Sequence, residues 1–121
     1  MRDIRYLGKK GEDITVDFLK KHGFFIFKRN YYCRFGEIDI IAEKDDLILF
    51  VEVKTRFEDY MVSPEEAVDK FKQKRIKHTA RDFISKLHSD YRYRFDVAAI
   101  TVRAENEEYK FKLNYIKNAF E

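Results

Sequence analysis

Apolar side chains recur every three or four residues at the start of the chain, which is the spacing of an amphipathic helix. The run ends at Gly23, a residue type that commonly follows the last helical turn. The pattern therefore predicts a first helix that ends at Gly23. Its inward positions are Ile4, Leu7, Gly11, Ile14 and Phe18.

The next three segments change to β patterns. Residues 24–32 are aromatic-rich and short, which favours a strand. Residues 36–42 and 47–55 flank an acidic turn at 44–46 and predict a hairpin. The second hairpin segment opens with the apolar run 47–51, which is typical of a central strand covered on both faces.

A second helix is predicted over residues 63–87. Ser63 can cap its N-terminus, Pro64 suits the first helical position, and Glu65 and Glu66 place acids in the first turn. Apolar residues spaced for one helix face follow, and we expect them to point inward: Val68, Phe71, Ile76, Ala80, Phe83, Ile84 and Leu87.

The end of the chain returns to β patterns. Residues 95–102 and 109–113 predict two strands around a turn at 105–107, whereas residues 114–121 fit no element clearly. The predicted order is α-β-β-β-α-β-β, an α/β fold with a mixed sheet flanked by helices. No repeat or linker interrupts the sequence, so we expect residues 1–121 to form a single domain.

The hairpin predicts that two carboxylates meet. If Asp45 and Asp46 form a two-residue turn, residue 44 pairs with 47 and 43 with 48, and Asp39 falls directly opposite Glu52. A four-residue loop gives the same register, whereas a three-residue loop shifts it by one residue. Because side chains alternate along a strand, each strand presents one set on the shared face: Glu37, Asp39 and Ile41 on the first, and Ile48, Phe50, Glu52 and Lys54 on the second.

Two opposed carboxylates need a physical reason. Opposed residues have Cβ atoms roughly 4.5–5.5 Å apart, where like charges destabilise the pair. A divalent cation such as Mg²⁺ removes that repulsion, keeps several waters and supports phosphodiester hydrolysis. Lys54, on the same face as Glu52, would orient the attacking water or stabilise developing negative charge. The alternative is a charged cluster in which Lys54 neutralises two acids at the end of the sheet.

Glu12 is a candidate third carboxylate. It lies one residue from the apolar stripe of the first helix, beside Gly11, whose missing side chain allows close packing. From there it could reach the sheet and join Asp39 and Glu52. The alternative interpretation of its position is a solvated helix residue.

Composition narrows the classes of function. The net charge of +3 permits an anionic partner without requiring one. A single cysteine excludes an internal disulfide and a cysteine-only zinc site, and it fits a reducing compartment. The chain shows no signal segment and no apolar run near ~18 residues, so we expect a cytoplasmic protein without a membrane partner. It also lacks a Walker-type phosphate loop and a nucleophile elbow, so ATPase and serine-hydrolase functions have no support.

Cations gather in the second predicted helix, with no acid between residues 70 and 81. Surface helices usually alternate signs, so this run favours a stripe that contacts phosphates. A solvated face balanced by acids elsewhere is the alternative. The candidate nucleic-acid contacts are Arg56, Lys70, Lys72, Lys74, Arg75, Lys77 and Arg81.

Aromatic residues near the hairpin also have two interpretations. Tyr31, Tyr32 and Phe35 could stack on unpaired bases. In a chain with 17% aromatic residues, core packing is the simpler role for most of them.

Short strings spread over nearly the whole chain match one known pattern. They are Gly11-Glu12, Asn30, residues 36–42, residues 50–56, residues 66–68, Lys72-Gln73, Ala80 and residues 94–97. Together these strings resemble the YraN family of small bacterial proteins, which look like Holliday-junction resolvases. The pair Gly-Glu-Ile-Asp and Val-Glu-Val-Lys is the most specific part of the resemblance.

The resemblance implies the restriction-endonuclease-like fold of the PD-(D/E)XK nuclease superfamily. It implies that Asp39 and Glu52 bind the metal and that Lys54 is the catalytic lysine. Glu12 would match the helix glutamate of resolvase-like members. The proline that names the motif is replaced here, because Ile38 precedes Asp39. Since resolvase-like enzymes commonly act as dimers, a homodimer is implied by analogy.

Two hypotheses follow from the sequence. The first is a metal-dependent nuclease that uses Mg²⁺ or Mn²⁺ and acts on DNA, with branched or otherwise structured DNA as a candidate substrate. The second is a nucleic-acid-binding module that keeps the nuclease fold without catalysis.

Overall fold

The structure is a computed structural model that describes residues 4–59 and 68–121. Its elements follow the predicted order α-β-β-β-α-β-β. They are α1 (Ile4–Lys21), β1 (Phe25–Cys33), β2 (Gly36–Lys44), β3 (Leu47–Phe57), α2 (Lys70–Ser85), β4 (Arg92–Glu105) and β5 (Glu108–Phe120).

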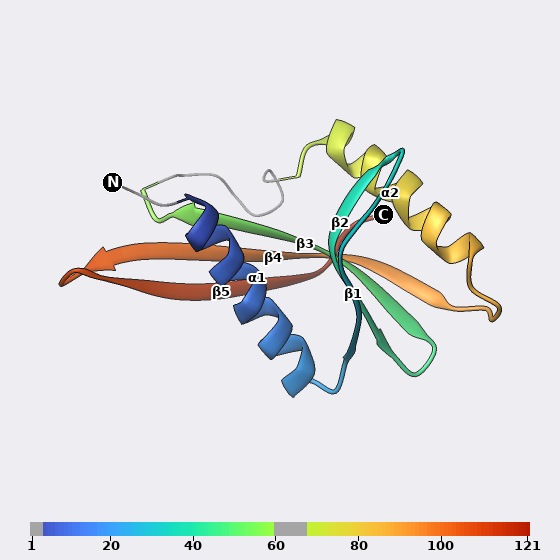
Figure 1. The fold of residues 1–121 in the computed structure, drawn as a ribbon, viewed down its shortest axis with the longest axis horizontal. Coiled ribbons are helices and arrows are strands. Elements are labelled where there is room, and N and C mark those ends of the chain that lie inside the picture. The colour runs from blue at the N-terminus through green and yellow to red at the C-terminus, as the bar shows by residue number, and fades with distance from the viewer. Residues whose placement is uncertain (1–3, 60–67) are drawn as a thin grey trace.

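All these strands form one sheet in the order β1-β2-β3-β4-β5. β3 and β4 run parallel, and the other neighbours run antiparallel. A parallel pair needs a crossover connection, and α2 lies in this one. α1 and α2 pack on opposite faces of the sheet (Figure 1). Neither of these helices is long and apolar enough to cross a membrane.

β3 is covered on both faces, as its apolar run predicts. Leu49 and Val51 pack in one cluster with Leu19 of α1, whereas Phe50 packs in another with Phe83 of α2. The three β3 side chains are at most 1% exposed. Burying such a side chain contributes about 1.5–3 kcal/mol to the free energy of folding. β3 therefore anchors both layers of the core, and its C-terminal residues extend from a well-packed strand.

The predicted hairpin register is confirmed. Asp45 and Asp46 form the turn, and Asp45 has a φ of 56°, a left-handed conformation that Asp tolerates better than most residues. The strand pairs on either side include Lys44 with Leu47, Glu43 with Ile48, and finally Ile40 with Val51.

The prediction that residues 37, 39 and 41 share one face is wrong. Ile38 packs on the α2 side and Ile40 on the α1 side, although regular alternation would place both on the same side. The change of face occurs beside Asn30 of β1, whose φ of 53° interrupts the extended backbone. Asp39 lies opposite this bend, so it belongs to neither face of a regular strand.

α2 is shorter than predicted. It begins at Lys70 after the N-cap Asp69, whose carboxylate accepts a hydrogen bond from the Lys72 N–H, and it ends at Ser85. The predicted start at residues 63–66 lies outside the described residues. Two residues predicted on the helix, Val68 and Leu87, lie beyond its ends but still pack against the core.

Phe71 does not point inward, which corrects another prediction. Its side chain is 72% exposed. The buried positions Ile76, Ala80 and Phe83 follow the helix period. Phe71 precedes Ile76 by five residues and is therefore rotated from it by about 140° around the helix axis.

The last two strands are longer than predicted, because β4 begins at residue 92 and β5 continues to residue 120. A buried carboxylate joins them. Asp96 is 0% exposed and accepts hydrogen bonds from Arg94, from the Tyr115 hydroxyl at 2.6 Å and from the Asn118 N–H at 2.8 Å. These charge-assisted bonds satisfy the carboxylate. No hydrophobic period signals such a polar anchor, so residues 114–121 could not be assigned from the sequence pattern.

α1 approaches β3 very closely at Gly11. A Cβ atom there would collide with the Thr55 hydroxyl oxygen and lie 3.3 Å from the Ile100 Cγ1. We expect Gly11→Ala to lower the free energy of unfolding by about 1–3 kcal/mol, because overpacking outweighs the better helix propensity of alanine. Thermal and urea unfolding measure the change.

Gly8→Ala is the matched control, because a Cβ atom at Gly8 would meet nothing within 4 Å. That variant should be neutral or stabilising. Adding Thr55→Ala to Gly11→Ala removes the obstructing hydroxyl and should recover part of the loss. A Gly11→Ala protein as stable as Gly8→Ala would contradict the close contact.

Candidate active site

The candidate site begins where β2 and β3 separate. The last paired residues are Ile40 and Val51, and Asp39 and Glu52 follow one step beyond them. The Asp39 Oδ2 accepts a hydrogen bond from the Val53 N–H at 2.8 Å. A side chain thus replaces the missing backbone acceptor and holds the Asp39 carboxylate beside Glu52. The register therefore brings the two predicted carboxylates together.

Glu52 is almost fully buried, with 5% of its surface exposed. Burial raises the pKa of Glu52 to about 8, and Asp39 adds to the rise through a hydrogen bond and its charge. The positive charges of Lys72 and Lys54 oppose the rise. At neutral pH the Glu52 carboxyl therefore favours its protonated form.

Two lysines flank this pair. The Lys72 Nζ, from the first turn of α2, lies 3.3 Å from the Glu52 Oε1. Lys54 extends from β3 and is half-buried. Burial lowers the pKa of Lys54, and the charge of Lys72 lowers it further. Its ammonium group is consequently a better proton donor than an ordinary lysine.

Lys72 was predicted as one of the phosphate-contacting cations of α2, and the structure places its ammonium group beside the Glu52 carboxylate. Its contact with phosphate stays a prediction. A signal for this position exists in the sequence. Lys72 precedes Ile76 by four residues and Thr79 by seven, and both of those residues are buried. Helix periodicity therefore places Lys72 on the inward side of α2.

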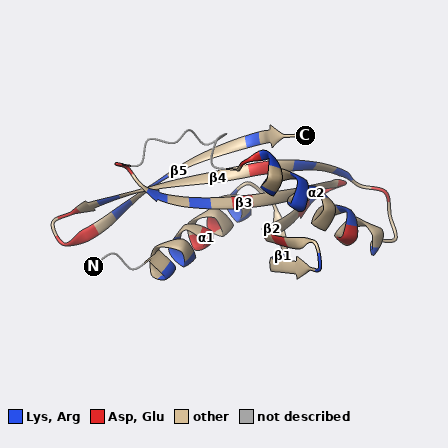
Figure 2. Cartoon of the chain, turned by 90° about the horizontal axis from the view of Figure 1, so that it is seen from above, with Lys and Arg blue, Asp and Glu red and all other residues tan. Residues whose placement is uncertain are grey.

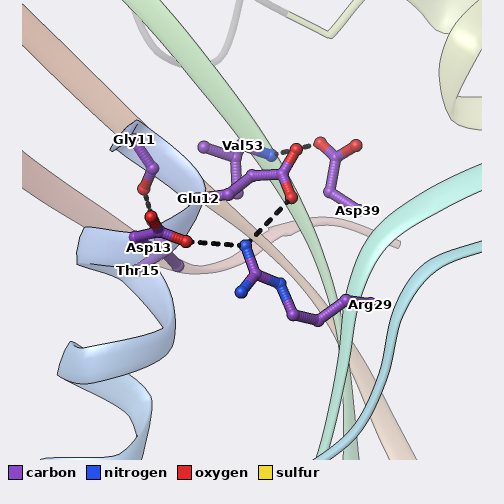
Figure 3. Close-up of polar contacts among 7 residues, drawn as sticks. All are labelled: Gly11, Glu12, Asp13, Thr15, Arg29, Asp39 and Val53. Atoms are coloured by element: carbon purple, nitrogen blue, oxygen red, sulfur yellow. Dashed lines mark hydrogen bonds and ion pairs between the residues drawn. The ribbon is translucent and has the colours of Figure 1, made fainter. Parts of the chain in front are cut away.

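Glu12 reaches the same space from α1. Arg29 of β1 donates a hydrogen bond to the Glu12 Oε1 at 3.5 Å and another to the Asp13 Oδ1 at 2.9 Å. Burial raises the pKa of Glu12 and the charge of Asp39 raises it further, whereas Arg29 opposes the rise. Figure 3 shows Glu12, Arg29 and Asp39 converging from three elements of the fold. Arg29 therefore restrains the predicted third carboxylate.

The predicted catalytic residues line one cleft of about 720 Å³, a size typical of small-molecule sites. One part of its wall is apolar and includes Ile4, Leu7 and Val102. The charged residues of the wall are Glu12, Asp39, Glu52, Lys54, Arg56 and Lys72.

The donor set fits a hard divalent cation. Asp39 and Glu52 offer carboxylate oxygens, and the raised pKa of Glu52 marks a place where a positive charge would stabilise the ionised carboxylate. Within residues 4–59 and 68–121, no group of three His, Cys, Asp or Glu side chains is arranged to hold a metal. Mg²⁺ and Mn²⁺ suit two carboxylates completed by water. A ligand role for Glu12 stays a prediction.

The cations of α2 do not form a single stripe. Lys72 turns toward Glu52, and the Arg75 Nε donates a hydrogen bond to the Phe35 carbonyl oxygen at 3.3 Å. Basic segments recur along the helix (Figure 2). Four basic residues, spaced by four, three and four positions, share the outer face of the helix: Lys70, Lys74, Lys77 and Arg81. None of the four forms an ion pair with a described residue.

Comparisons with known proteins agree on one family. The pattern of the uncharacterised protein family UPF0102 matches residues 11–100. A UPF0102 protein of Clostridium botulinum strain Hall is 44% identical over 117 residues, covering 95% of this chain and 94% of the relative. A UPF0102 protein of Caldicellulosiruptor bescii is 47% identical over 120 residues, covering 98% of this chain and 99% of the relative. These names state no activity, so the likeness to resolvases stays a prediction. The chain belongs to the UPF0102 family.

Proposed function

We propose that this protein is a metal-dependent nuclease that hydrolyses phosphodiester bonds in DNA. One observation carries the proposal: the buried Glu52 carboxyl and the adjacent Asp39 carboxylate line the same cleft as Lys54. Burying one acid beside a second acid opposes folding, and perturbed titratable groups of this kind concentrate at functional sites. Metal-assisted cleavage of a nucleic-acid backbone is a function that would explain why the acids and the lysine are held together.

Asp39 and Glu52 would hold Mg²⁺ or Mn²⁺, which when bound supplies charge neutralisation at phosphate oxygens and acidifies a water. Glu52 must first release its proton, and the adjacent ammonium groups of Lys72 and Lys54 favour its charged form. Lys54 donates a hydrogen bond to the attacking water or to the developing oxyanion. Glu12 assists from α1, where Arg29 holds its side chain.

The resemblance to resolvase-like nucleases supports the same assignment. The mixed sheet with one helix on each face is compatible with a restriction-endonuclease-like fold. Asp39, Glu52 and Lys54 occupy the motif positions of the metal-binding acids and the catalytic lysine. Branched DNA is the substrate class favoured by this resemblance, and a homodimer would supply two sites for two strands.

We expect Asp39→Ala, Glu52→Ala and Lys54→Ala each to reduce cleavage by at least about a hundredfold, because each removes a group that acts on the reacting phosphate. The assay uses single-stranded, duplex, flap and four-way-junction DNA with Mg²⁺ or Mn²⁺. Glu58→Gln is the matched control, because Glu58 is an exposed acid just beyond the end of β3. Full cleavage by a folded Asp39→Ala protein would contradict the mechanism.

The raised pKa of Glu52 predicts how stability changes with pH. The folded protein keeps this proton up to about pH 8, whereas the unfolded chain loses it near the ordinary value of 4.5. The stability contributed by the proton is full below pH 4.5 and declines as the pH rises to about 8. We therefore expect the metal-free wild type to lose Tm across this window relative to Glu52→Gln.

Added Mg²⁺ should reverse the loss, because the cation replaces the proton between Asp39 and Glu52. The gain in Tm should be larger at about pH 8 than at about pH 6 and absent in Glu52→Gln. Scanning fluorimetry measures both effects, with Glu58→Gln as the control. An equal Mg²⁺ effect in wild type and Glu52→Gln would place the cation elsewhere.

A non-catalytic nucleic-acid-binding module is the second candidate function. The observation that favours it is the outer face of α2, where Lys70, Lys74, Lys77 and Arg81 share one side of the helix. Such a stripe binds phosphates without requiring the carboxylates of the cleft.

We expect the triple variant Lys70→Gln/Lys74→Gln/Arg81→Gln to bind DNA more weakly at low salt. The slope of log affinity against log salt should fall by about 0.9 for each lost contact to duplex phosphate. A Lys20→Gln/Lys21→Gln variant, with both changes at the end of α1, is the control. Unchanged binding and slope in the α2 variant would remove the stripe from the DNA interface.

A further inference from the structure

Two large aromatic side chains stand exposed at a second groove. Tyr32 near the end of β1 is 78% exposed, and Phe71 in the first turn of α2 is 72% exposed. A single exposed ring is ordinary on a protein surface. Here both rings line one groove of about 470 Å³, together with Lys72 and Arg75. The two strongly exposed rings therefore belong to one feature of the surface.

The groove adjoins the candidate active site. Lys72 lines both the groove and the catalytic cleft, where its Nζ lies 3.3 Å from the Glu52 Oε1. A strand of nucleic acid that lies across Lys72 would therefore pass from the groove into the catalytic cleft. Because consecutive phosphates lie only a few ångströms apart, neighbouring nucleotides could occupy both.

The groove has a fixed frame. The turn before β2 packs directly on α2, since a Cβ atom at Gly36 would lie 3.3 Å from the Thr79 Oγ1 and 3.5 Å from the Arg75 Nε. The same nitrogen donates to the Phe35 carbonyl oxygen. This bond leaves the terminal amino groups of Arg75 available, and Arg75 forms no ion pair with a described residue.

The other nearby rings already have partners. Tyr31 packs edge-to-face against Phe83, and Phe35 stacks on His78. Neither Tyr32 nor Phe71 pairs with another ring among the described residues. Their faces are therefore open to a ligand.

The charged residues around the groove have both signs, and they differ in whether another residue already binds them. Asp69 and Glu37 lie on its wall with Lys72 and Arg75. The Asp69 carboxylate is engaged as the N-cap of α2, where it accepts the Lys72 N–H at 2.8 Å. Arg75 is exposed and offers its donors to an anion. Two free rings beside an available guanidinium match a base with its phosphate.

We propose that this groove is a subsite for unpaired nucleotides, with bases stacked on Tyr32 and Phe71 and a phosphate held by Arg75. Bases inside a duplex are stacked on one another and cannot present their faces to these rings. The inference therefore names the substrate class as nucleic acid with a single-stranded segment beside the cleft. This inference rests on the proposed function only where it concerns cleavage of the bound strand, because binding in the groove needs no metal.

The test measures binding separately from cleavage. Fluorescence anisotropy in EDTA compares a labelled oligothymidylate of about 15 nucleotides with a duplex of the same length. We expect Tyr32→Ala and Phe71→Ala each to weaken binding of the single strand about tenfold and to change duplex binding less than about twofold. Phe25→Ala is the matched control, because the Phe25 ring is 64% exposed on β1 and does not line the groove.

Conservative variants separate stacking from a structural role. Tyr32→Phe and Phe71→Tyr keep the rings and should bind the single strand as wild type does. A 2-aminopurine base in the oligonucleotide should lose fluorescence on binding wild type, and this quenching should be reduced in Tyr32→Ala and Phe71→Ala. Circular dichroism and Tm values confirm that the alanine variants are folded.

Three results would overturn the subsite: unchanged single-strand binding in both folded alanine variants, equal losses on single strand and duplex, or a dimer that Phe71→Ala dissociates in sedimentation. The last result would assign the groove to a second copy of the chain. Absence of cleavage by wild type, with ring-dependent single-strand binding intact, would remove the nuclease function and leave the subsite standing.

Discussion

The hydrogen bond from the Val53 N–H to the Asp39 carboxylate is the contact on which the site depends. It forms where backbone pairing between β2 and β3 ends, so the Asp39 side chain accepts the Val53 N–H that has no backbone partner on β2. The same geometry holds Asp39 beside Glu52, inside a fold whose central strand is buried on both faces. The acid pair is therefore set by backbone structure rather than by the preferences of two repelling side chains.

Burial then shifts the pKa values of three groups at the site toward their neutral forms. The pKa of Glu52 and that of Glu12 rise, and the pKa of Lys54 falls, with burial as the largest cause in each case. A metal cation beside the acids and a phosphate beside the lysine would return these groups to their charged forms. Under the proposed function, the site would contact the reacting phosphate of a nucleic acid, the adjoining groove its bases, and the outer face of α2 its more distant phosphates.

Structural constraints elsewhere serve the same arrangement. Gly11 lets α1 lie against β3 close enough for Glu12 to line the cleft. On the far side of β3, the buried Asp96 joins β4 to β5 through two hydrogen bonds, from the Tyr115 hydroxyl and the Asn118 N–H. The bend at Asn30 turns Arg29 toward α1 while Tyr31 faces α2. Close packing and polar anchoring thus position residues that the hydrophobic pattern alone leaves unplaced.

The sequence by itself determined the order of elements, the buried central strand and the hairpin register, because a two-residue turn and a continuous apolar run leave few alternatives. That register predicts that Asp39 lies next to Glu52, and the hydrogen bond from the Val53 N–H holds it there. Tertiary structure alone decided the change of face along β2, since a positive φ at Asn30 leaves no mark in an apolar pattern. It also decided what the α2 residues contact, although helix periodicity already places Lys72 on the inward side of the helix. Where the helix begins and how it is rotated against the sheet turn Lys72 toward Glu52 and leave Phe71 in solvent, and both depend on contacts between segments distant in the chain.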